Sequence, residues 1–171
     1  MKKIPLLFLL IIFSCSTPKV ITDYDSKTDF TKYKTYAFYE DVGNGLNELD
    51  VKRIKEAMEA ELKTMSLKKN KNPDFYINFT SKYTESNNNN TIAIGFGNAG
   101  RNGGYGVSGG IPIGGEKLNE ELIIEFVDAN TNLLFWKGVL NSTIKEQRKP
   151  EEKEAHFNMI IPKILLKYPP K

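Results

Sequence analysis

The stretch Glu120–Ile144, EELIIEFVDANTNLLFWKGVLNSTI, holds two runs of β-branched and aromatic residues on either side of the turn-forming cluster DANTN. Two such runs joined by a loop of four or five residues predict a β-hairpin. In the first run Leu122, Ile124 and Phe126 point one way, and the opposite face carries the charge of Glu125. We therefore expect this hairpin at the centre of a sheet that is covered on its apolar face.

The second run contains the only tryptophan of the chain, Trp136. In a regular strand Trp136 shares a face with Leu134 and Leu140, and a ring of this size belongs to a core more often than to an exposed strand. The folding core is predicted here.

Five further segments show regular patterns. Alternation and aromatic or β-branched density predict strands, and apolar residues every three to four positions predict helices. The strands are Val20–Asp25, Tyr33–Tyr39 and Asp74–Tyr83, and the helices are Asn47–Leu67 and Pro150–Tyr168. The predicted fold is an α+β two-layer sandwich, with a mainly antiparallel sheet covered by two helices. Its order is strand, strand, helix, strand, glycine-rich strand or loop, strand, strand, helix.

Each predicted helix has one informative feature. In the first helix, which Asn47 or Asp50 can cap, the apolar stripe carries Met58 and Met65 and is expected in the core, although it could also be a partner-binding face. In the second helix, Pro162 lacks the N–H that would bond to residue 158, so a kink or a fresh start is expected there.

The chain begins as a secretory signal peptide does. Lys2 and Lys3 precede the apolar run Ile4–Phe13, which is half the roughly 20 residues of a spanning helix. The following Cys15 completes a sequence, Ile-Phe-Ser-Cys, that resembles the lipobox of bacterial lipoproteins, in which the cysteine is lipidated. A free buried cysteine is the alternative.

These features divide the chain into three parts. Residues 1–14 are expected to be the lipoprotein signal peptide, 15–19 the lipidated N-terminus with a short tether, and 20–171 a single α+β domain with a glycine-rich insert at 87–115. Acyl chains, such as palmitate, on Cys15 would anchor the protein to a membrane without spanning it.

The charge of the chain excludes a nucleic-acid-binding role. The sequence has 24 basic and 21 acidic residues, and loss of Lys2 and Lys3 with the signal peptide leaves a net charge of about +1. With Cys15 lipidated, no thiol remains for a disulfide, a metal or a nucleophile. We expect no cofactor and no metal site.

The insert contains ten of the thirteen glycines and two G-x-G-x-x-G patterns, which start at Gly95 and Gly104. A dinucleotide site would need a helix to begin there, which the following glycines prevent, and a calcium-binding β-roll would need aspartates that the insert lacks. A flexible hairpin or loop that extends the sheet or meets a partner is predicted. The expected partner-binding residues are Ile92, Ile94, Phe96, Tyr105 and Val107.

The mature chain resembles a family of bacterial lipoproteins known as domain of unknown function 4136. The resemblance lies in Asp23–Asp25 with Phe30, Tyr33–Phe38, Val127–Ala129, Leu134–Gly138 and Lys167–Pro170. It implies an α+β sandwich on a lipoprotein of the Gram-negative envelope, without an assigned activity. It also implies that Tyr24, Tyr36, Trp136 and Gly138 serve the fold.

Two functions remain open from the sequence. The first is a non-enzymatic outer-membrane lipoprotein, anchored on the periplasmic side, which binds an envelope protein or stabilises an assembly of undetermined oligomeric state. The residues that follow Cys15, Ser16 and Thr17, include no acidic residue, and this favours the periplasmic side of the outer membrane. The alternative is a carboxylate-dependent hydrolase of envelope glycans that uses Glu125 and Asp128. His156, the only histidine, is expected to be solvated.

Overall fold

The computed structural model describes residues 18–86, 91–97, 106–112 and 117–170. These residues form a six-stranded sheet, a two-stranded sheet, two α-helices and one short 3-10 helix. In chain order the elements are β1 (Val20–Tyr24), η1 (Phe30–Lys32), β2 (Thr35–Phe38), α1 (Glu48–Thr64), β3 (Lys68–Lys69), β4 (Phe75–Glu85), β5 (Thr91–Gly97), β6 (Gly106–Pro112), β7 (Lys117–Asp128), β8 (Leu134–Lys145) and α2 (Pro150–Leu165).

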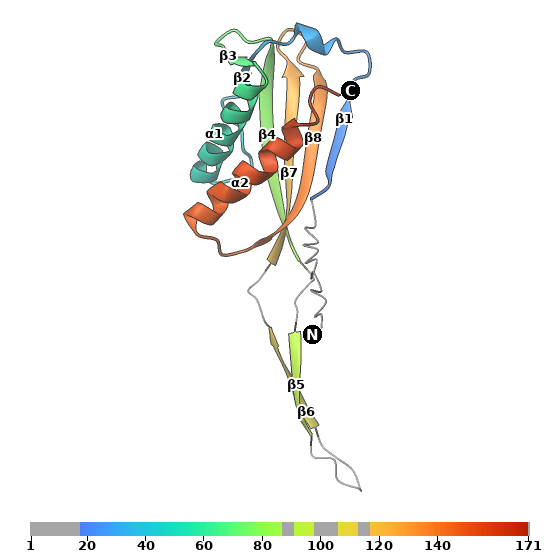
Figure 1. Ribbon diagram of the computed structural model, residues 1–171, viewed down its shortest axis with the longest axis vertical. Coiled ribbons are helices and arrows are strands. Elements are labelled where there is room, and N and C mark those ends of the chain that lie inside the picture. Colours follow the sequence, from blue (N-terminus) through green and yellow to red (C-terminus); the bar gives the residue numbers. More distant parts are fainter. Residues whose placement is uncertain (1–17, 87–90, 98–105, 113–116, 171) are drawn as a thin grey trace, which may run out of the picture.

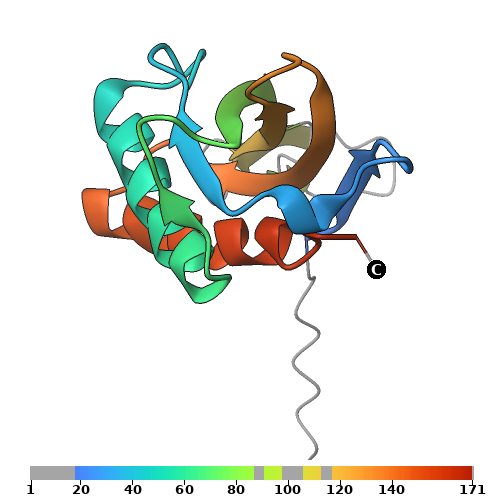
Figure 2. The same ribbon diagram turned by 90° about the horizontal axis from the view of Figure 1, so that it is seen from above.

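The strands of the large sheet follow the order β1-β8-β7-β4-β2-β3. Neighbouring strands are antiparallel except that β2 runs parallel to both β3 and β4. Both helices lie on the same face of this sheet (Figures 1 and 2). The prediction of an α+β sandwich with a mainly antiparallel sheet is confirmed.

The β7–β8 hairpin forms the centre of the sheet, as the sequence predicted. Leu122, Ile124 and Phe126 are fully buried beneath the helices. A register shift follows Phe126, because Phe126 pairs with Trp136 while the next residue of β7, Val127, pairs with Leu134. The extra residue on β8 makes a β-bulge, which ends the simple alternation. Leu134 is therefore 48% exposed and does not share the buried face of Trp136, so that part of the prediction was wrong.

Trp136 lies at the middle of an aromatic cluster. Its ring centroid is 4.8 Å from that of Phe126 and 5.4 Å from that of Tyr168. Gly138, two residues further along β8, allows α2 to approach, because a Cβ at this position would lie 2.5 Å from Cγ2 of Ile164. Trp136 and Gly138 thus serve the fold, as the family resemblance implied.

The first predicted helix is confirmed, with Asn47 as its N-cap. The side chain of Asn47 accepts a hydrogen bond from the backbone N–H of Asp50. Ile54, Met58 and Leu62 are fully buried, so the methionine-bearing stripe of α1 belongs to the core.

The second helix differs from the prediction at one point. No fresh start occurs at Pro162, because α2 continues to Leu165. Pro162 removes one backbone bond only one turn before the helix ends, and burial of Ile161, Ile164 and Leu165 around it offsets that loss. Of the helices in the described ranges, none combines the length and the apolar character needed to cross a membrane.

Within the glycine-rich insert, β5 and β6 pair with one another in an antiparallel register from Thr91↔Pro112 to Gly97↔Gly106. They form a sheet of their own and do not extend the six-stranded sheet. Of the predicted hairpin or loop, the structure shows a hairpin, and the expectation that it extends the large sheet was wrong. The hairpin projects from the end of the domain where β4 ends and β7 begins (Figure 1).

Candidate functional site

The residues predicted to bind a partner fall mainly on the β5–β6 hairpin. The register sets Phe96 opposite Val107 and Ile92 opposite Ile111. Ile94 also belongs to β5, where it is in register with Gly109. Cys15 and Tyr105, the remaining predicted site residues, lie outside the described ranges.

Glu125 and Asp128, the pair considered for glycan hydrolysis, occupy different environments. Glu125 accepts a hydrogen bond from Asn78 Nδ2 at 3.2 Å, and its Oε1 lies 3.6 Å from Nζ of Lys137 on the neighbouring strand. Its partners therefore lie along the sheet, and Asp128 is held separately at the end of β7.

Asp128 organises the β7–β8 turn. One carboxylate oxygen accepts hydrogen bonds from the backbone N–H groups of Asn130 and Thr131, both at 2.9 Å. The other accepts from Lys32 Nζ at 2.9 Å and from the Tyr33 hydroxyl at 2.8 Å. Burial alone would raise the pKa of Asp128, but these donors, Lys32 foremost, hold the pKa well below its usual value. A carboxylate held ionised by four donors suits a structural role and not that of a general acid.

A basic groove runs along the outer edge of β2, where β3 stops after two residues. The register between them ends at Tyr36↔Lys69, after which the Asn70 N–H donates to the Tyr36 carbonyl at 2.9 Å. On the other side of β2, the Tyr39 N–H donates to the Ile77 carbonyl at 3.1 Å. Because backbone groups alternate in direction along a strand, the N–H and C=O of Phe38 face the open side.

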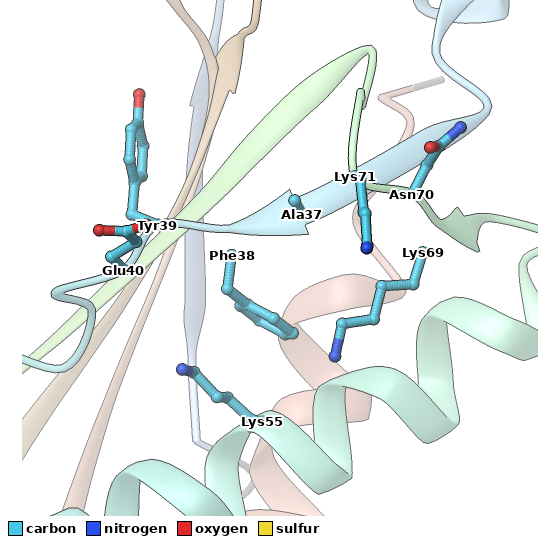
Figure 3. A pocket seen from close by; sticks show the side chains of 8 residues that line it. All are labelled: Ala37, Phe38, Tyr39, Glu40, Lys55, Lys69, Asn70 and Lys71. Carbon is cyan, nitrogen blue, oxygen red and sulfur yellow. The ribbon is translucent and has the colours of Figure 1, made fainter.

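Three lysines surround this open edge. Lys55 comes from α1, whereas Lys69 and Lys71 come from β3 and the segment after it, and all three line the groove (Figure 3). The Nζ atoms of Lys55 and Lys69 lie 5.5 Å and 5.8 Å from the centroid of the Phe38 ring. These are cation–π distances. Glu40 lies beside Tyr39, at the other end of the groove from Lys71.

The groove has a volume of about 560 Å³, which is in the range of ligand-binding clefts. No sequence pattern predicted this groove, because only the parallel pairing of β2 with β3 and β4 brings Lys69 and Lys71 to Phe38.

A second polar cluster, also unforeseen, contains the only histidine. Glu120 is 1% exposed and accepts hydrogen bonds from the Ser142 hydroxyl at 3.1 Å and the Tyr83 hydroxyl at 3.2 Å. Nε2 of His156 lies 2.5 Å from Oε2 of Glu120, and the His156 side chain is only 10% exposed. The expectation of a solvated histidine was wrong, because α2 sets His156 over a buried carboxylate of β7.

The Glu120 cluster has marked electrostatic effects. Burial opposes the charge of Glu120, but the contact with His156 and the Ser142 hydrogen bond lower its pKa below the usual value. Burial raises the pKa of Tyr83 to about 12. Ser142 and His156 both direct their polar atoms to Oε2 of Glu120, so the Ser142 hydroxyl donates to the carboxylate and not to an imidazole base. In the described residues, no three or more His, Cys, Asp or Glu side chains gather in a metal-holding arrangement.

Comparison with known proteins bears on the family and on the fold. The family model "Domain of unknown function (DUF4136)" matches residues 20–170. No curated protein sequence matches the chain significantly.

Among solved structures, a PDZ domain protein from Parabacteroides distasonis is similar at 18% identity with a TM-score of 0.59, over 89% of this chain and 35% of that one. The chain thus spans about a third of that protein, and the likeness shows the fold alone. A PelC dodecamer from Paraburkholderia phytofirmans matches at 7% identity with a TM-score of 0.45, over 87% of this chain and 96% of that one.

Proposed function

The chain belongs to the DUF4136 family, a domain of unknown function, and from that premise we propose that it is an outer-membrane lipoprotein with a non-enzymatic binding role. In this proposal Cys15 carries the lipid, the domain faces the periplasm, and the β5–β6 hairpin binds a partner. The sequence before Pro18 supports the anchor, and the separate hairpin supports the binding role.

The hairpin is the observation that carries the binding role. In the described part of the chain, each of its strands pairs only with the other, so both outer edges present unpaired backbone N–H and C=O groups. A lone two-stranded hairpin is marginally stable in water, and it gains stability when another strand pairs with its edge. Residues 87–115 contain a single charged residue, Arg101, so little opposes such a contact.

The position of the hairpin relative to the tether further supports a partner at the membrane. Lys117 pairs with Lys145 at the end of the sheet from which the hairpin leaves. The first residue of β1, Val20, lies nearer that end than its last, because Val20 pairs with Leu140 and Tyr24 with Trp136. Val20 follows Cys15 by five positions, a reach of about 17 Å at most. A lipid on Cys15 would therefore hold the hairpin end toward the membrane.

Site-specific photo-crosslinking in the intact, lipidated protein tests this function. A photoreactive amino acid at Phe96 should give discrete adducts in the native envelope. The same amino acid at Lys63, an exposed residue of α1, is the matched control. Absence of adducts at Phe96 beyond those at Lys63 would contradict hairpin binding.

The hydrolase alternative makes a different prediction. Glu125 and Asp128 both have partners within the sheet and the turn, and these partners favour structural roles. We expect the purified domain to release no sugar from envelope glycans. Glycan turnover that disappears in Glu125→Gln would overturn the non-enzymatic proposal.

A further inference from the structure

We propose that the groove beside β2 binds an acidic, extended segment of a partner protein, which adds as a strand to the sheet beyond the short β3. This site is separate from the hairpin and does not depend on the proposed function of the hairpin. Three features of the groove lead to this class of ligand: the open backbone edge, the converging lysines and the aromatic floor.

The open edge selects an extended peptide. Phe38 directs its N–H and C=O away from β4, and the pairing of β2 with β3 has already ended at Tyr36. An added strand would continue the line of β3 along β2 and would bond to these two groups. An extended peptide presents free N–H and C=O groups for this pairing, whereas most of those of a helix are bonded within the helix.

The lysines select acidic side chains. Lys55 and Lys71 have no ion pair with any described residue, and Lys69 has one, with Glu59 at 2.7 Å. That pair is exposed, so it contributes little and can exchange with an incoming carboxylate. Figure 3 shows the Lys55 and Lys69 amines on either side of Phe38 and the Lys71 amine directed toward Lys69. Carboxylates on alternate positions of a strand would face these cations.

The aromatic side chains around the groove favour apolar residues at the ligand positions between the acidic residues. The Phe38 ring is only partly buried and packs edge-on against Phe79 of the core at 6.2 Å. On the opposite face of the sheet, Tyr39 stacks on Tyr76 at 5.0 Å. A strand with alternating acidic and apolar residues would place its carboxylates on the face of Phe38 and the lysines, and its apolar side chains on the face of Tyr39 and Tyr76.

Lysines near an edge strand can also serve only to prevent unwanted strand pairing. In that arrangement the charges usually lie on the edge strand itself. Here β3, the edge strand, does consist of two lysines, but it ends before Phe38, and the other two groove lysines come from α1 and from the segment after β3. A purely protective role would give weak binding of a Glu-Val peptide that is no better than that of a Glu-Pro peptide, which the experiment below distinguishes.

The test uses the mature domain labelled with ¹⁵N and three blocked synthetic peptides of equal length. One alternates Glu with Val, one alternates Lys with Val, and one alternates Glu with Pro, which removes every second N–H group and fixes φ of these residues near about −65°, away from the extended strand conformation. The Glu-Val peptide should shift the amide resonances of Phe38 and Lys69 and slow hydrogen exchange of the Phe38 N–H. Binding should weaken with added salt. The other two peptides should bind at least tenfold more weakly.

Charge reversal provides the second arm of the test. Lys55→Glu combined with Lys71→Glu should weaken Glu-Val binding at least tenfold. Lys63 is an exposed position on α1 away from the groove, so Lys63→Glu should change the affinity for the Glu-Val peptide by no more than twofold. Thermal melts should show that the double variant and the Lys63→Glu variant are both folded.

Each contrary result is decisive. Equal binding of the Glu-Pro peptide would overturn strand addition. Equal binding of the Lys-Val peptide, shifts confined to other residues, or no binding of the Glu-Val peptide at millimolar concentration would overturn the proposal as a whole. Inorganic phosphate that shifts the groove lysines while the Glu-Val peptide does not would identify a simple anion site instead.

Discussion

At the scale of single residues, Trp136 is the largest fully buried side chain of the described residues. It is fully buried between Phe126 and Tyr168, and its Nε1 has no hydrogen-bond partner in the described residues, so its role is packing. We expect Trp136→Ala to lower the free energy of unfolding by about 3 to 5 kcal/mol, the usual result of emptying a large aromatic site. Urea denaturation measures this value.

Leu134→Ala is the control for that measurement, because Leu134 lies in the same strand but is half exposed. It should change the free energy of unfolding by no more than about 0.5 kcal/mol. A loss of similar size in both variants would mean that the strand end unfolds as a unit and that the indole has no special role.

The low pKa of Asp128 predicts that the stability of the domain depends on pH. Its folded-state pKa lies below its unfolded value, so its contribution is fully present above the unfolded pKa of about 3.9 and is lost as pH falls toward the folded pKa. Asp128→Asn should therefore destabilise the domain at pH 7, by about 1 to 3 kcal/mol, the usual effect of losing charged hydrogen bonds. The difference from the parent should shrink below about pH 4. A difference that is constant from pH 7 to pH 2.5 would contradict this assignment.

At the scale of elements, the contact between β8 and α2 depends on Gly138. An added Cβ would meet Ile164 Cγ2 at 2.5 Å and the Trp136 ring at 2.7 Å. Gly138→Ala should therefore destabilise by about 1 to 3 kcal/mol through overpacking, as thermal or urea unfolding can measure. Ile164→Leu removes the branch methyl, so it should partly restore stability in the Gly138→Ala background while costing stability alone. If Ile164→Leu does not restore stability, the destabilisation caused by Gly138→Ala does not come from the contact with Ile164.

The β5–β6 hairpin should be dispensable for the fold. It pairs with no strand of the six-stranded sheet, and its glycines have a large backbone entropy to lose on ordering. Replacement of residues 87–115 by a short Gly-Ser linker should preserve the circular dichroism spectrum and the melting temperature. Loss of the fold would show instead that these residues are integral to the domain, and the hairpin could then no longer be treated as a separate binding element.

How much the sequence predicts depends on whether a feature is local. The alternation around Ile124 and the cap at Asn47 are local, and both were predicted correctly. The bulge that exposes Leu134 depends on how β7 pairs with β8, and this pairing cannot be predicted from the sequence of either strand alone.

The same reason explains why two clusters were missed. Glu120 shares the parity of Leu122 on β7, which was a usable sign that it is buried, but its partner His156 is 36 residues away. The groove needs β2 to lie parallel to β3 and β4, and parallel pairing leaves no local turn signal.

At the scale of the whole molecule, the hairpin leaves one end of the sheet, the first residue of β1 lies nearer that end than its last, and the groove lies toward the other end (Figure 1). The 12 residues of β7 separate Lys117, near the hairpin, from Asp128, near β3, by about 36 Å. If Cys15 carries the lipid, the hairpin should lie near the bilayer, and the groove should face away from it, where a periplasmic partner can reach it.

Depth-dependent fluorescence quenching tests this orientation. The lipidated protein has no other thiol once Cys15 is acylated, so Phe96→Cys or Asn70→Cys can each carry a single fluorophore. In vesicles with headgroup-labelled quencher lipids, the probe at position 96 should be quenched more strongly than the probe at position 70. Equal quenching, or stronger quenching at position 70, would contradict the orientation. A protein that fails to associate with the vesicles at all would contradict the anchor, and the two results are distinguishable because association is measured first by flotation.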